Sequence, residues 1–97
     1  MITRHYLVEG KVQGVGFRRF LLKRVQPLGV SGWVRNLEDG RVEAVLQGAE
    51  QDVIRAEVYL RRGPESGSVD RVEVREVKAE PMEEFRIEKN GEKVWEF

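Results

Sequence analysis

The order in which helical and strand-like segments follow one another is the feature that most limits the fold of this chain. Apolar residues recur at helical spacing in only two stretches, one beginning near residue 18 and the other at about residues 50–62. Stretches typical of strands precede, separate and follow these two helices. The expected strands cover roughly residues 3–12, 30–36, 41–47 and 69–78, with a short final strand at 85–87.

This β-α-β-β-α-β order with a short fifth strand predicts an α/β (α+β) two-layer sandwich. We expect two helices packed on one face of an antiparallel sheet, the ferredoxin-like arrangement. In such a sheet the first two strands run parallel with another strand between them. Their C-terminal ends then lie at the same edge, roughly 10 Å apart. The glycine-rich loop after the first strand and Asn36 after the second are therefore expected to face each other.

Local signals set the ends of these elements. Pro27 and Gly29 are expected to stop the first helix, and Gly63-Pro64 the second. Asp39-Gly40 predicts a hairpin turn between the second and third strands. In the fourth strand the alternation slips by one residue before Val77, which predicts a bulge there.

Length and composition exclude several classes of protein. The 97 residues suit one domain over residues 1–97, and 17 basic residues balance 17 acidic ones. A zero net charge argues against coating nucleic acid or anionic membranes. With no cysteine and one histidine, His5, we expect no disulfide, no metal site and no cofactor. No signal peptide or membrane-spanning stretch is visible, so a cytoplasmic monomer without nucleic-acid or membrane partners is expected.

The loop that leads into the first helix has the composition of an anion site. Glycines at positions 10, 14 and 16 let the chain curl so that backbone N–H groups point inward at the positive end of the helix dipole. Arg18 adds a guanidinium fork suited to phosphate oxygens. The loop matches neither the P-loop nor the dinucleotide-binding pattern. From composition alone, a flexible turn with a solvated Arg18 remains open, and the pattern indicates an anion site rather than an enzyme.

Asn36 closes the second expected strand. Its carboxamide has both a donor and an acceptor, so it can hold a water and a carbonyl oxygen at once. An asparagine at a strand end is also a common turn-former, and residue type alone leaves that alternative open. Trp33, in the same strand, is expected to be a core residue rather than a stacking platform.

Taken together, the two segments resemble the acylphosphatase family. Its first signature is similar to Val8-Glu9-Gly10-Lys11-Val12-Gln13-Gly14-Val15-Gly16-Phe17-Arg18. Its second is similar to Gly32-Trp33-Val34-Arg35-Asn36, followed by Gly40, Val42 and Gly48. Two long motifs in the right order and at the right distance are a specific signal, and the resemblance covers about residues 4–88.

The resemblance implies a metal-independent hydrolase that splits an acyl phosphate into a carboxylate and inorganic phosphate. Arg18 would bind the phosphate oxygens and Asn36 would orient the attacking water, as the two catalytic residues. The substrate's own phosphate would help to deprotonate that water. The phosphate-binding loop would comprise Gly10, Gln13, Gly14, Val15, Gly16, Phe17 and Arg18.

Two alternatives and two departures from the family pattern accompany this interpretation. The first alternative is a non-catalytic module that binds phosphate or carbamoyl phosphate, similar to a segment of a large hydrogenase-maturation protein. The second is an RNA-binding domain, because the RRM shares this element order. Its third strand carries stacking aromatic residues, which residues 41–47 lack. One departure is Gln26-Pro27, which could shorten the last turn of the first helix. The other is residues 89–97, a C-terminal extension that could lengthen the fifth strand, form a hairpin at Asn90-Gly91, or contact a partner through Trp95 and Phe97.

Overall fold

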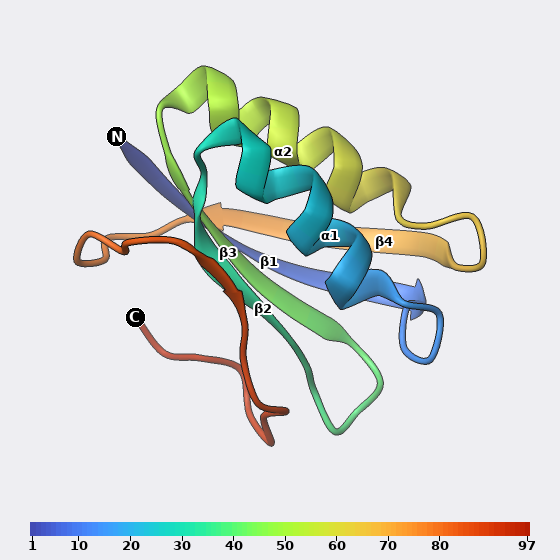
Figure 1. Ribbon diagram of the computed structural model, residues 1–97. Coiled ribbons are helices and arrows are strands. Elements are labelled where there is room, and N and C mark those ends of the chain that lie inside the picture. The colour runs from blue at the N-terminus through green and yellow to red at the C-terminus, as the bar shows by residue number, and fades with distance from the viewer.

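Two helices lie on one face of a five-stranded sheet, as Figure 1 shows. The computed structural model describes residues 1–97. The helices are α1 (Phe17–Val25) and α2 (Glu50–Arg62), and the strands are β1 (Ile2–Lys11), β2 (Ser31–Asn36), β3 (Val42–Gly48), β4 (Ser68–Glu76) and β5 (Phe85–Ile87). The two-layer, ferredoxin-like arrangement predicted from the order of the elements is confirmed.

The pairing of the first three strands positions the two candidate segments. The strand order across the sheet is β4-β1-β3-β2-β5. β3 pairs antiparallel with both β1 and β2, so β1 and β2 run in the same direction on either side of it. Their C-terminal ends consequently share one edge of the sheet, as expected. The glycine-rich loop follows β1 at this edge, and Asn36 is the last residue of β2.

β5 departs from the expected antiparallel sheet, because it pairs parallel with β2. The reason lies in residues 77–84, which cross one end of the sheet between β4 and β5. The Gln47 side chain holds this crossing: its amide nitrogen donates to the Glu80 carbonyl at 3.0 Å, and its oxygen accepts from the Met82 N–H at 2.7 Å. The chain thereby reaches the end of the sheet at which β2 begins, so β5 runs in the direction of β2.

The predicted bulge before Val77 is wrong, because β4 has already ended at Glu76. An irregularity occurs instead near the other end of β4, where the register with β1 shifts between Glu9 and Gly10. Gly10 has φ 130°, and a Cβ atom there would overlap the Ser68 carbonyl oxygen. Glycine at this position therefore allows β4 to approach closely just before the glycine-rich loop.

The main core lies between the sheet and the helices. The helices contribute six fully buried side chains to it, namely Phe17, Leu21, Val25, Val53, Ala56 and Leu60. α1 ends at Val25 and is followed by a 3₁₀ turn over Gln26–Leu28 and by Gly29 with φ 73°, as Pro27 and Gly29 predicted. Neither helix combines the length and apolar character needed to cross a membrane.

The C-terminal tail, residues 89–97, lies on the side of the sheet away from the helices (Figure 1). Alternate residues of β2 point to this side, and Trp33 is one of them. It was predicted to be a core residue, but it is half-buried here and is not part of the main core. The Trp95 ring meets Trp33 edge-on with centroids 6.0 Å apart, and the Phe97 ring meets His5 at 5.4 Å. The tail thus packs against this chain's own sheet.

Glu43 is a fully buried carboxylate between this second face and the tail. It accepts hydrogen bonds from Arg35 Nε and the Trp95 N–H, both at 2.7 Å, and Oε2 lies 2.6 Å from His5 Nε2. Burial alone would raise the pKa of Glu43. Hydrogen bonds from His5, the Trp95 N–H and Arg35 outweigh that effect and hold the pKa below its ordinary value.

We expect Glu43→Gln to be less stable than the wild type at pH 7, because Arg35 then loses a buried countercharge. A carboxylate with a depressed folded-state pKa stabilises the protein above its unfolded-state pKa of about 4.3. That stabilisation is lost as the pH falls through the folded-state pKa. Urea unfolding should therefore show the difference in the free energy of unfolding between the two proteins shrinking as the pH falls below about 5. A difference of constant size would contradict the assigned ionisation.

Candidate active site

The loop between β1 and α1 presents backbone N–H groups that donate no hydrogen bond to any other group of the protein. Gly14 and Gly16 have φ values of 74° and 77°, which turn the chain into the first turn of α1. The first bond of the helix runs from the Phe20 N–H to the Gly16 carbonyl at 2.9 Å, and no N–H from Gln13 to Arg19 donates within the protein. This turn has neither an acidic residue nor a side-chain cap. The partial positive charge of these N–H groups and of the helix dipole favours the binding of an anion at this loop.

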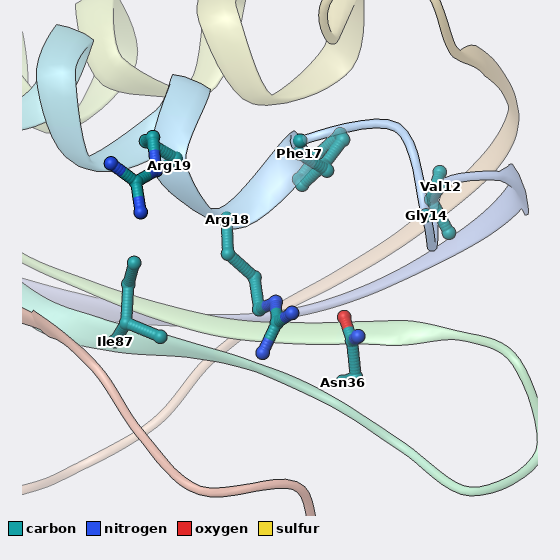
Figure 2. Close-up of a pocket in the computed structure, with 8 residues that line it drawn as sticks. Val12, Gly14, Phe17, Arg18, Arg19, Asn36 and Ile87 are labelled. Atoms are coloured by element: carbon teal, nitrogen blue, oxygen red, sulfur yellow. The ribbon is translucent and has the colours of Figure 1, made fainter.

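A pocket of about 300 Å³ lies between this loop and the ends of β2 and β5 (Figure 2). In Figure 2 the Arg18 side chain descends from α1, and its guanidinium lies beside the carboxamide of Asn36, which rises from β2. The residues that line the pocket are Val12, Gly14, Gly16, Phe17, Arg18, Arg19, Asn36 and Ile87. The topology predicted that residues 18 and 36 would meet at this edge, and the structure places them there.

Arg18 carries a charge that no carboxylate of the protein neutralises. Its one polar contact is a hydrogen bond of 3.4 Å from Nη1 to the side-chain oxygen of Asn90. Arg19 also lines the pocket, and no acidic residue does. The pocket is therefore locally positive in a protein whose net charge is zero, and the planar guanidinium suits the oxygens of a phosphate.

Asn36 has a buried polar atom without a partner. The residue is 8% exposed, and its side-chain oxygen forms no hydrogen bond. Leaving such an atom unpaired costs about 1–3 kcal/mol. The backbone of Asn36 is fixed, because it pairs with Val42 of β3 and its carbonyl accepts from the Gly91 N–H at 2.9 Å. A held, unpaired oxygen at a pocket indicates a place for a water or a ligand group.

The structure gathers some of the predicted site residues around the pocket and leaves others away from it. Those that line it are Gly14, Gly16, Phe17, Arg18 and Asn36. Gly10, Gln13 and Val15 do not. Gly10 lies at the register shift of β1, and the Val15 carbonyl accepts from the Ser66 hydroxyl at 2.8 Å. These contacts brace the loop from the side of β4.

The side chain of Gln13 has a role that no sequence pattern indicated. Its amide nitrogen donates to the carbonyl oxygens of Leu37 at 2.7 Å and Arg41 at 2.9 Å. The loop is thereby tied to the turn between β2 and β3, directly after Asn36. These partners are far away in sequence and are backbone groups, so no side-chain pattern marks them. Arg19 and Ile87, which also line the pocket, were not among the predicted residues either.

Comparison with known proteins assigns the family. A family model described as acylphosphatase matches residues 4–87. The chain belongs to the acylphosphatase family. An acylphosphatase of Koribacter versatilis is 48% identical over 87 residues, which cover 89% of this chain and 79% of that relative. The family resemblance stated from the two sequence motifs is thus confirmed.

Solved structures agree with this assignment. The acylphosphatase from Bacillus subtilis has a TM-score of 0.86 and 33% identity, with 90% of this chain and 98% of that chain covered. HypF of T. kodakarensis has a TM-score of 0.79 and 32% identity, and the match covers 96% of this chain but only 12% of HypF. The same sandwich therefore occurs both in small acylphosphatases and as a segment of a much longer protein.

Proposed function

We propose that this acylphosphatase-family chain hydrolyses the carboxyl–phosphate bond of small acyl phosphates at the pocket between α1 and β2. The observation that carries the proposal is the joint opening of Arg18 and Asn36 onto this pocket, beside backbone N–H groups without partners. A phosphate dianion is the group that best matches such donors and the uncompensated guanidinium. The names of the relatives support the same substrate class.

Positioning and charge stabilisation would supply most of the rate in this reaction. The N–H groups of the loop and Arg18 bind the phosphate oxygens, while the Asn36 oxygen accepts a hydrogen bond from the attacking water and holds it in line. The water oxygen bonds to phosphorus as the bond from phosphorus to the acyl oxygen breaks, and the carboxylate leaves with that electron pair. No carboxylate or imidazole lines the pocket. The water proton therefore passes to an oxygen of the substrate's own phosphate.

A phosphate-binding module without turnover is the second candidate, because the same fold matches a segment of HypF. Benzoyl phosphate separates the two candidates. An acylphosphatase should release benzoate and phosphate from it with a metal chelator present. If inorganic phosphate stabilises the protein against unfolding but benzoyl phosphate is not hydrolysed, the binding module is favoured instead.

We expect Arg18→Ala to lower kcat/KM for benzoyl phosphate on the order of 10²–10³-fold, or about 2–4 kcal/mol, because the transferring phosphoryl group loses its charged donor. Lys23→Ala is a matched control, since it removes the same charge from an exposed position of the same helix. Turnover of Arg18→Ala near that of the control would refute the assigned role.

For Asn36→Ala we expect a large fall in kcat while inorganic phosphate still binds, because the water is no longer held but the phosphate donors remain. Phosphate binding can be followed as the rise in Tm with phosphate concentration, which needs no turnover. Equal losses of turnover and of phosphate binding would show that Asn36 acts in binding or folding and not in orienting water.

A further inference from the structure

The chain beyond β5 continues along β2 and brings Asn90 to the edge of the pocket. The Glu88 N–H donates to the Val34 carbonyl at 2.9 Å, and the Gly91 N–H donates to the Asn36 carbonyl at 2.9 Å. Gly91 also forms a parallel bridge with Leu37. Asn90 therefore lies between two backbone contacts to β2 and its continuation, and the second of these contacts is to Asn36 itself.

The side chain of Asn90 meets the guanidinium of Arg18. Its oxygen accepts from Arg18 Nη1 at 3.4 Å, and this is the one polar contact that Arg18 makes. A long, exposed hydrogen bond of this kind adds little to the stability of the fold. The guanidinium lies beside Asn36 in Figure 2, and a contact at its end limits the directions that a flexible arginine side chain can take. A carboxamide does so without neutralising the charge that the phosphate needs.

Residues C-terminal to Asn90 bind to the sheet. Gly91 lies directly against the guanidinium of Arg35, where a larger residue would collide with it. Arg35 Nη2 donates to the Lys93 carbonyl at 2.8 Å, and the Trp95 N–H donates to Glu43 at 2.7 Å. These contacts keep residues 90 and 91 in place although Asn90 is itself exposed.

We propose that Asn90 is a positioning residue for Arg18, and that the C-terminal tail is the device that holds it there. The proposal deepens the proposed function, since it rests on Arg18 being the phosphate-binding arginine. It assigns to residues beyond the family match at 4–87 a part in the site.

Asn90→Ala tests the proposal through phosphate binding. We expect about 3- to 10-fold more inorganic phosphate to be needed for the same rise in Tm, because Arg18 is no longer pre-oriented. The KM for benzoyl phosphate should rise by a similar factor with little change in kcat, since Arg18 holds the phosphate in both the bound and the transition state. The Tm without phosphate should stay within about 2 °C of the wild type, because a single exposed hydrogen bond is lost.

Three further variants make the result specific. Asn90→Gln keeps a carboxamide oxygen and should restore most of the phosphate affinity. Lys89→Ala changes the exposed neighbouring residue, which makes no hydrogen bond to Arg18, and should behave as the wild type. Adding Asn90→Ala to Arg18→Ala should weaken phosphate binding no further, because the two residues act through one contact.

Several outcomes would overturn the proposal. One is that Asn90→Ala leaves both the rise in Tm with phosphate and the KM for benzoyl phosphate unchanged. Another is that Asn90→Ala lowers the phosphate affinity of Arg18→Ala by the same factor as it lowers that of the wild type. A lowered Tm without phosphate that Asn90→Gln fails to restore would assign Asn90 a structural role. If wild-type protein binds phosphate but does not turn over benzoyl phosphate, the proposed hydrolysis fails while the phosphate measurements still decide the role of Asn90. A wild type that phosphate does not stabilise would contradict both.

Discussion

The site depends on one constraint of strand pairing. β3 lies between β1 and β2 and is antiparallel to both, so two strand ends that are distant in sequence come to the same edge of the sheet. One end continues into a loop whose backbone N–H groups have no partners, and the other ends in Asn36. Without this pairing, Arg18 and Asn36 would be an ordinary surface arginine and a turn asparagine. The side chain of Gln13 reinforces the constraint, because it ties the loop to the turn that follows Asn36.

Contacts on the face of the sheet away from the helices hold the C-terminal tail beside the same edge. Glu43 is buried there, which is costly for a charged group unless hydrogen bonds compensate it. Two of its donors come from the sheet side chains of His5 and Arg35, and the third is the backbone N–H of Trp95 in the tail. The tail therefore supplies the third hydrogen bond to a buried carboxylate. Between β5 and Trp95 the chain passes Asn36, whose carbonyl accepts from the Gly91 N–H. The tail thus contacts both the buried Glu43 on the second face and the end of β2 at the pocket.

Much of this arrangement could be predicted from the sequence, because it depends on local signals and on topology. Periodicity and the Pro27 and Gly29 signals located α1, and the element order alone placed residues 18 and 36 at one edge. What could not be predicted depends on long-range partners. The direction of β5 is set by a crossing that Gln47 holds from β3, and the contacts of the Gln13 side chain are backbone carbonyls. Trp33 was predicted to be a core residue but lies half-buried on the face away from the helices, since strand periodicity does not say which face of a sheet the helices cover.

We infer that one anion is held by the N–H groups of the loop and by Arg18, within reach of Asn36. Titration of the protein with inorganic phosphate, followed through the NMR resonances of individual amides, would locate this anion. We expect the backbone amides from Gln13 to Arg19 and the side-chain amide of Asn36 to shift together, with one apparent affinity. Shifts centred on another part of the surface, or loop shifts that leave the Asn36 side chain unaffected, would contradict it.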